Sequence, residues 1–180
     1  MSDDDASRLA RMLDIVEIRD LGHRYAVAVC AEDVDALADI YDDDADAGVH
    51  GRGSAGMHAM FTDYFQRIDR RTFMQVGTHQ VDVDGDEATG VCFTRTWSGH
   101  PDERGWDDLM IVFFDTYRRR DGRWRFASRQ QTLHDVRHHQ AQAQATDRFV
   151  ERIRSASTNA APPRTWERWD QWRERRRARR

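Results

Sequence analysis

Three side chains in this sequence have the types and the spacing for acid–base chemistry at a buried site: Tyr25, His79 and Asp115. Tyr25 follows Ile18 by one heptad on the apolar stripe of a predicted helix, so we expect it to face a sheet. Asp115 alternates with bulky aromatic residues, which places its carboxyl group on the buried face of a strand. A buried carboxyl group has to be hydrogen-bonded or neutral, because an unpaired charge is too costly there. The imidazole of His79 has the chemistry of a general base.

Further residues are expected to surround these three side chains. Gln75 has the same strand parity as His79, so both should point into one pocket. Phe93 and Trp97 alternate along a second predicted strand and should share a face. We therefore predict a cavity whose walls are Cys30, Gln75, Phe93 and Trp97.

Arg95 lies between two aromatic residues on the predicted strand face that contains Phe93 and Trp97. An Arg among aromatic rings can bind the carboxylate or phenolate of a substrate. Two alternatives remain open: Arg95 pairs with Asp115 inside the barrel, or it lies outside after a register slip.

Several classes of chemistry can be set aside. All 28 basic residues are arginine, which excludes Schiff-base lysines, lysine-anchored pyridoxal phosphate and a phosphate-loop lysine. The side chains of His134, His138 and His139 could suggest a metal site, since the first two have the i,i+4 spacing of metal ligands, but no suitable carboxylate set accompanies them. Asp42, Asp44 and Asp46 imitate the start of a calcium loop that lacks its glycine. We expect neither a metal nor a cofactor.

The elements that must position these residues change from helical to strand periodicity along the chain. Asp33 and Ser54 can cap helices, and Asp84-Gly85-Asp86 and Asp121-Gly122 are hairpin signals. Three helices followed by an antiparallel meander predict an α+β layer fold. The expected elements are helices at 7–30, from 33 and from 54, and strands around 75–83, 89–97, 108–119 and 124–133.

The length of 180 residues suits one domain with a real core. We place that domain at residues 1–136, followed by an extension at 137–180 with a Pro-Pro linker and a Trp/Arg-rich tail. Residues 164–180 carry +5, so the rest carries −9 of the formal net charge of −4. The Arg residues of the tail repel one another, so we expect the tail to be dispensable for folding. No apolar run approaches the ~20 residues of a membrane span, and the acidic start does not resemble a secretory signal. These observations favour a cytoplasmic protein.

Three stretches in register resemble SnoaL-like proteins of the nuclear-transport-factor-2-like superfamily. They are Ile15 to Tyr41 with the following Asp43-Asp44-Ala45, then Val81 to Ala88, and then Asp115-Thr116-Tyr117 with Arg119 to Phe126. The resemblance covers roughly residues 8–135. It implies a cone-shaped antiparallel sheet curved around a long N-terminal helix, with a small-molecule pocket at its closed end.

The resemblance also implies roles for particular positions. Related dehydratases carry an Asp–His pair at the positions of Cys30 and Gln75, so the usual pair is replaced here. His79 is the alternative base, and His50 lies where such folds line the pocket mouth. Tyr25 and Asp115 match the two oxyanion donors of ketosteroid isomerases, in which a phenol and a neutral carboxylic acid stabilise an enolate.

We therefore expect a cofactor-free lyase, isomerase or cyclase that acts on a hydrophobic polycyclic or aromatic molecule, polyketide- or steroid-like. The alternative is a non-catalytic small-molecule-binding or accessory protein of the same fold, which the replaced Asp–His pair favours. Aromatic and β-branched residues on both faces of strands 89–117 predict a homodimer through the outer face of the sheet. Because only the tail is basic, we do not expect the body to bind nucleic acid.

Overall fold

The computed structural model describes residues 2–67, 72–99 and 105–140. Its elements follow in the order helix α1 (Asp3–Cys30), helix α2 (Val34–Asp39), the short 3-10 helix η1 (Gly48–His50), helix α3 (Gly53–Arg67) and four strands. The strands are β1 (Thr72–Asp84), β2 (Glu87–Gly99), β3 (Gly105–Arg120) and β4 (Arg123–Gln140). They form one antiparallel sheet in the order β1-β2-β3-β4. The predicted α+β architecture, a curved antiparallel sheet over a long N-terminal helix, is confirmed.

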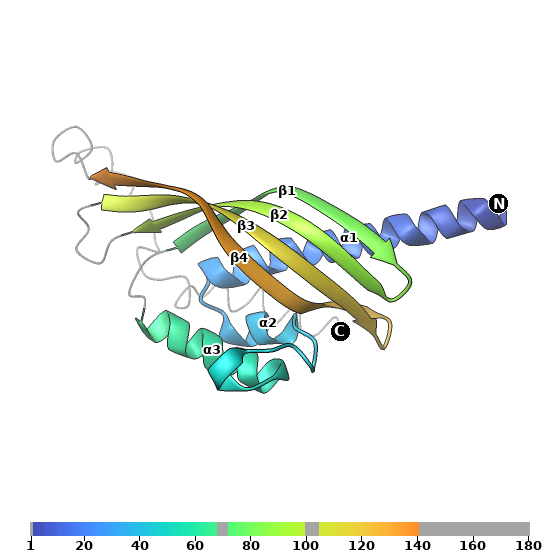
Figure 1. Ribbon diagram of the computed structural model, residues 1–180, viewed down its shortest axis with the longest axis horizontal. Coiled ribbons are helices and arrows are strands. Elements are labelled where there is room, and N and C mark those ends of the chain that lie inside the picture. The colour runs from blue at the N-terminus through green and yellow to red at the C-terminus, as the bar shows by residue number, and fades with distance from the viewer. Residues whose placement is uncertain (1, 68–71, 100–104, 141–180) are drawn as a thin grey trace, which may run out of the picture.

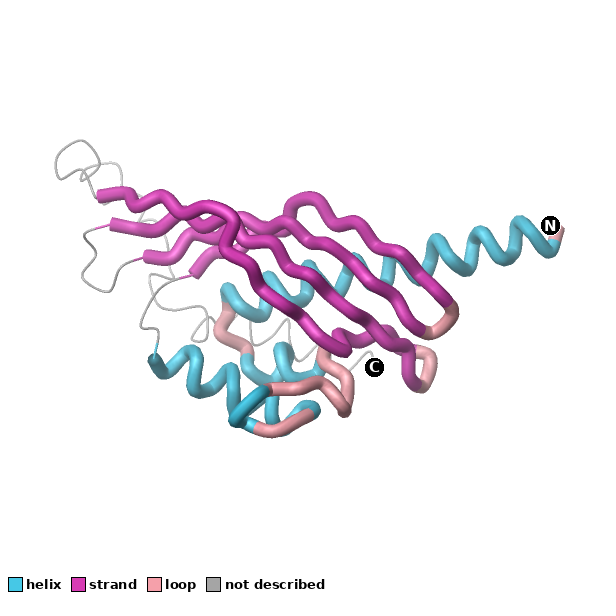
Figure 2. Tube along the Cα trace, viewed as in Figure 1, coloured by secondary structure: helices cyan, strands magenta, loops and turns pink. Residues whose placement is uncertain are grey.

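The helices lie on one side of the curved sheet, which we call its inner face (Figures 1 and 2). Helix α1 passes along this face, and its N-terminal end projects beyond the sheet. Ser2 caps α1 through a reciprocal pair of bonds with Asp5, so the helix begins earlier than the predicted residue 7. No helix in the described ranges is both long and apolar enough to cross a bilayer.

Both hairpins form where the Asp-Gly signals predict them. Asp121 and Gly122 have φ angles of 52° and 71° and join Arg120 to Arg123. Two successive positive φ angles match the twist of the flanking strands, which explains why Gly follows Asp here. Strand β4 then continues to Gln140, past the predicted end at residue 133, because its C-terminal part still pairs with β3. The possible helix at 146–155 and the tail at 164–180 lie outside the described residues.

The core lies between α1 and the inner face of the sheet. Ile18, Leu21 and Tyr25 from α1 are buried there, as the helical spacing predicts. Phe113 and Tyr117 from β3 and Phe126 from β4 meet them from the sheet. Helices α2 and α3 close one end: the backbone of Asp42 and Ile40 hydrogen-bonds to both polar groups of Phe126, which fixes the loop after α2 against β4.

Candidate functional site

A cavity of about 270 Å³ lies between the inner face of the sheet and helices α1 and α3. Aromatic rings from the helices and from the sheet form much of its wall, and a smaller set of polar side chains is distributed over the strands. The aromatic lining residues are Tyr25, Tyr41, Phe61, Tyr64 and Phe113, and the polar ones are Thr72, Thr96, Ser98, Arg129 and Gln131. An apolar pocket with a few converging polar groups is the usual form of a small-molecule site.

Arg129 on β4 is the charged residue of this lining. Its side chain is only 2% exposed. Its guanidinium carbon lies 3.9 Å from the ring centre of Phe113, 4.3 Å from that of Tyr25 and 4.6 Å from that of Phe126. Such contacts stabilise a buried cation through the negative faces of the rings. None of its three guanidinium nitrogens makes a hydrogen bond of good geometry with the described residues, although the thiol of Cys92 also interacts with this guanidinium.

Asp115 on β3 provides the compensating charge. Its Oδ1 lies 3.4 Å from Nε of Arg129, and its side chain is fully buried. The hydroxyl of Tyr117 donates a hydrogen bond of 2.9 Å to Oδ2 of Asp115. The same hydroxyl lies 2.9 Å from Nε2 of His79 on β1. Since a hydroxyl has one proton and Tyr117 gives it to Asp115, Nε2 of His79 must be the protonated nitrogen of its ring.

These four residues form a continuous buried chain, His79–Tyr117–Asp115–Arg129, which we call the polar chain. Its Arg129 end lines the cavity, and its His79 end lies against Gly22 of α1. The deprotonated Nδ1 of His79 has no hydrogen-bond partner in the described part of the protein. Buried ionisable groups with perturbed pKa values are typical of functional sites.

Burial dominates the pKa values along the polar chain. It raises the pKa of Asp115 to about 6, against the opposing effect of the positive charge on Arg129. It lowers the pKa of His79 to about 4, and the charges of Arg129 and Arg19 act in the same direction. It raises the pKa of Tyr25 to about 12, so this phenol keeps its proton. At neutral pH the polar chain therefore contains an ionised Asp115 and a neutral His79.

Two β-bulges bring the ends of the polar chain to the inner face. On β1, Gly77 and Thr78 together oppose the single residue Phe93, so the pairing passes from Val76 to His79. On β4, Ala127 is the extra residue between the partners of Thr116 and Tyr117. Each bulge shifts the alternation by one residue. His79 and Arg129 thus point inward, although the parity of the preceding residues would place them outside.

The SnoaL-like domain model matches residues 10–130 of the chain. The chain belongs to the SnoaL-like family. No curated protein matches this SnoaL-like chain significantly.

Solved structures share the fold at low sequence identity. A type 2 hexachlorocyclohexane dehydrochlorinase aligns with a TM-score of 0.65 and 20% identity, over 77% of this chain and 99% of its own. A candidate scytalone dehydratase from Novosphingobium aromaticivorans DSM 12444 aligns with a TM-score of 0.61 and 19% identity, over 74% and 92%. An NTF2-like protein from the same species has a TM-score of 0.60 and 25% identity, over 72% and 88%.

The structure brings Tyr25, His79 and Asp115 of this SnoaL-like chain close together but does not place them all on the cavity. Tyr25 lines it, and Arg129 connects Tyr25 to Asp115. His79 and Asp115 are buried behind that lining. The hydrogen-bond partner of Asp115 is Tyr117.

The expected walls Gln75, Phe93 and Trp97, together with Arg95, lie on the other face of the sheet, so that part of the prediction is wrong. Cross-strand partners share a face, and Gln75 pairs with Arg95, which pairs with Met110. Because of the bulge at Gly77, the side chains of Gln75 and His79 point to opposite faces of the sheet. Gln75, Phe93 and Arg95 instead line an outer depression of about 500 Å³.

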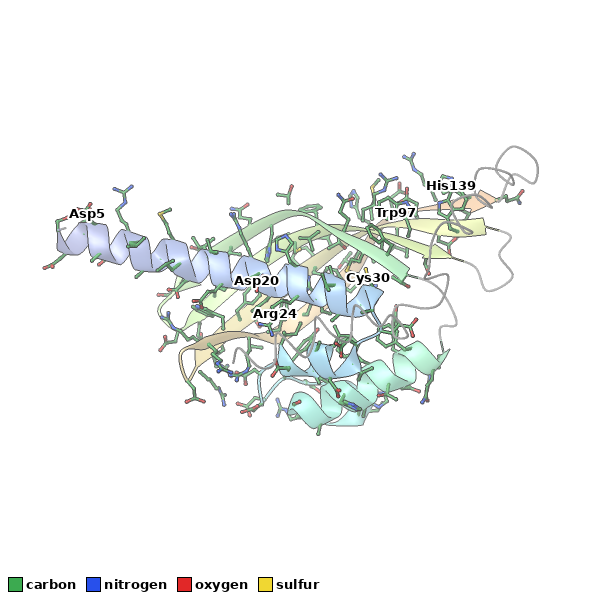
Figure 3. The ribbon with its side chains drawn as sticks, turned by 180° about the vertical axis from the view of Figure 1, so that it is seen from behind. Asp5, Asp20, Arg24, Cys30, Trp97 and His139 are labelled. Carbon is green, nitrogen blue, oxygen red and sulfur yellow. The ribbon has the colours of Figure 1, made fainter. Side chains whose placement is uncertain are left out.

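Arg95 adopts the outer of its possible positions. Its Nε donates a 2.8 Å hydrogen bond to Asp108, and its guanidinium carbon lies 4.8 Å from the centre of the Trp97 ring. Figure 3 shows Trp97 at the far end of the sheet, away from the projecting start of α1. Arg95 therefore has both a carboxylate and an aromatic partner outside the cavity.

Cys30 and His50 have structural contacts. Cys30 ends α1 (Figure 3), and its sulfur accepts a 3.1 Å hydrogen bond from the backbone N–H of Met74. This contact attaches α1 to β1 at the position where related dehydratases have their Asp. His50 in η1 lies 3.5 Å from the carboxylate of Asp63 on α3 and does not line the cavity.

Two residues of the polar chain, Arg129 and Tyr117, were not predicted from the sequence. Tyr117 shares strand parity with Asp115, and this signal was sufficient to place its hydroxyl beside the carboxyl group. Arg129 had no such signal, because the parity of Trp124 and Phe126 assigns it to the outer face. The candidate ligands His138 and His139 contact Asp107 and Trp106, and the described residues contain no group of three metal-ligating side chains.

Proposed function

We propose that this chain is a cofactor-free enzyme of the lyase, isomerase or cyclase type that moves a proton on a hydrophobic small molecule bound in the inner cavity. The observation that carries the proposal is the polar chain, which connects an aromatic cavity to a buried carboxylate and a buried imidazole. A dehydrochlorinase and a candidate dehydratase with the same fold support proton transfer as the type of chemistry.

The size of the cavity favours a smaller molecule than a steroid. Ligand pockets commonly measure roughly 300–1,000 Å³, and the volume of about 270 Å³ lies below this range. We propose a ligand with one or two aromatic rings, which could contact the rings of Tyr25 and Phe113.

The pKa values suggest how the roles are divided. Asp115 is mostly ionised at neutral pH, so we assign it to proton acceptance, through one water molecule beside Arg129, and not to hydrogen-bond donation. Tyr25 stays protonated and lines the cavity, so its hydroxyl is the candidate donor to a developing oxyanion. His79 supports the carboxylate through Tyr117.

A non-catalytic binding protein is the second candidate, and one observation favours it. No carboxylate or imidazole is among the side chains that line the cavity in the described ranges. In that case the polar chain only stabilises the core and orients Arg129.

Hydrogen–deuterium exchange distinguishes the two candidates without knowledge of the product. One- and two-ring ketones, including 2-tetralone, are incubated with the protein in D₂O, and loss of the α-proton signal is followed by NMR. We expect exchange above the buffer rate, lowered about 10²- to 10³-fold by Tyr25→Phe. Asp115→Asn should lower it by about 10²- to 10⁴-fold. Asp107→Asn, a buried Asp at the other end of β3, is the matched control.

Binding without exchange would favour the second candidate. If the ketones shift the resonances of cavity residues but no α-proton exchanges faster than in buffer, the enzymatic proposal is rejected.

A further inference from the structure

The guanidinium of Arg129 has more hydrogen-bonding capacity than the described protein uses. It is a fixed cation with five N–H groups, and its nitrogens make no hydrogen bond of good geometry with the described residues, while Asp115 approaches only its Nε side. A buried donor without an acceptor is unfavourable by about 1–3 kcal/mol, and more for a charged group. Natural proteins retain such groups where a water molecule, an ion or a ligand completes them.

Arg129 belongs to the cavity lining, but its guanidinium nitrogens are almost completely covered, so an acceptor that enters from the cavity reaches them only if neighbouring side chains shift. Asp115 lies behind this lining. Two of the three aromatic rings around the guanidinium, those of Tyr25 and Phe113, also line this cavity. A planar acceptor with an aromatic body would match both the fork of N–H groups and the rings.

We propose that the inner cavity binds a small aromatic anion, a carboxylate or a phenolate, on Arg129, and that binding adds one proton to the polar chain. This inference goes beyond the proposed function: an anion that adds a proton to Asp115 removes the proposed base, so it is a ligand that inhibits proton transfer in the same cavity and not the substrate. It also holds for a binding protein, because it concerns an equilibrium and not turnover.

Proton uptake follows from the shared use of one cation. In the free protein the charge of Arg129 stabilises the ionised form of Asp115. A bound anion brings a second negative charge to the same guanidinium, which favours the neutral form of Asp115. Oδ1 of Asp115 is available for the proton, because Oδ2 accepts the bond from Tyr117 and Oδ1 has no hydrogen-bond partner among the described residues.

The groups that face Asp115 come from every element packed around it. On the described residues they are Tyr25 of α1, Tyr41 after α2, His79 of β1, Cys92 of β2, Tyr117 of β3 and Arg129 of β4. Burial raises the pKa values of Tyr25, Tyr41, Tyr117 and Cys92 and lowers that of His79, so these five stay neutral near pH 7. Among these six groups, Asp115 is then the one whose charge changes at a pH just below 7.

The direction of the pH dependence is fixed by this assignment. Protonation accompanies binding, so the affinity is highest at low pH and decreases as the pH rises above the pKa of about 6 of Asp115. Uptake of one full proton makes the Kd rise about tenfold for each pH unit.

The test uses 2-naphthoate as the probe and neutral 2-naphthamide as its matched control, titrated against the full chain by fluorescence between about pH 6 and pH 8. Over this range a carboxylate of ordinary pKa remains ionised. We expect naphthoate to bind at least tenfold more tightly than naphthamide, and its Kd to rise with pH while that of naphthamide stays constant. If naphthoate is too large, benzoate and benzamide replace the pair.

Three variants assign the effect to residues. Arg129→Gln should remove the preference for the anion, whereas Arg95→Gln, on the outer face, should keep it. Asp115→Asn should retain or tighten naphthoate binding and abolish its pH dependence.

Each contrary result rejects the proposal. Equal affinities for acid and amide, a pH-independent Kd in the unmodified protein, or no binding of naphthoate or benzoate at any pH would each do so without any variant. Anion binding that is pH-dependent in a protein without proton-exchange activity would keep this inference and reject the enzymatic function.

Discussion

The pKa changes of Asp115 and His79 have opposite signs, and this predicts an unusual dependence of stability on pH. The folded state holds the proton of Asp115 more tightly than the unfolded chain does, so acidification from about pH 6 to pH 4 stabilises the fold through this residue. The folded state resists protonation of His79, so acidification from pH 6.5 to about pH 4 destabilises the fold through that residue. In the unmodified protein the two effects should largely cancel.

The magnitudes follow from the pKa values. One pKa unit corresponds to about 1.4 kcal/mol. The pKa of Asp115 changes from 3.8 to about 6, and that of His79 from 6.5 to about 4, so each is linked to an effect on the order of 3 kcal/mol. The pH ranges over which the two residues change the stability overlap almost completely.

Substitution of one partner should expose the contribution of the other. Relative to the unmodified protein, Asp115→Asn should lose about 3 kcal/mol of unfolding free energy between pH 6.5 and pH 4, because only the His79 effect remains. His79→Gln, whose amide can still reach Tyr117, should gain a similar amount over the same range. Removal of Asp115 also leaves Arg129 unopposed and lowers the pKa of His79 further, which enlarges the loss.

Urea unfolding followed by circular dichroism at several pH values measures these differences. Titration of the many surface carboxylates contributes equally to all variants, so the difference between variants is the relevant quantity. Asp107→Asn controls for the loss of a buried carboxylate elsewhere on β3. Parallel pH profiles for the unmodified protein, Asp115→Asn and His79→Gln would refute the assigned pKa changes.

Three further predictions concern other parts of the structure. Arg129→Met should lower the unfolding free energy by about 3–5 kcal/mol, because it leaves Asp115 unpaired. Adding Asp115→Asn should restore most of this loss. Urea unfolding of both single variants and the double variant measures the coupling, and additive losses would contradict the pairing. The outer face of the sheet exposes an apolar surface made by Phe73, Phe93, Met110 and Phe114. We therefore expect a homodimer that Phe93→Glu converts to a monomer. Light scattering that shows the unmodified chain to be a monomer at micromolar concentration would refute this. Deletion of 164–180 should change the melting temperature by little, as measured by calorimetry, and a large decrease would show that its tryptophans belong to the core.

The fold could be predicted from the sequence because its signals are local. The apolar spacing of α1, the cap at Asp33 and the Asp-Gly turns each act over a few residues, and all appear where expected. The face of Asp115 was also predictable, since β3 alternates regularly through that residue.

The site could be predicted only in part, because two of its residues depend on bulges. Strand parity misplaced Gln75 on the cavity and gave no reason to consider Arg129. A bulge is decided by how two distant strands pair. Gly77 is an isolated glycine within a strand, which is a known signal for a bulge, whereas Ala127 gives no such signal. The sequence therefore predicts Tyr25 correctly as a lining residue of the cavity, but it assigns to the cavity strand residues that lie on the outer face of the sheet.

The bulge at Ala127 also has a consequence for how related chains should be compared. Its extra residue can be gained or lost by a one-codon change while Phe126 and Arg129 both keep their inward direction, because the strand on either side retains its partners. Relatives that differ in length by one residue here can thus present the same inner side chains. An ungapped alignment through this position would pair inward residues of one protein with outward residues of the other. Homologues of Arg129 should accordingly be identified by their cross-strand partner, Asp115, and not by their distance from Phe126.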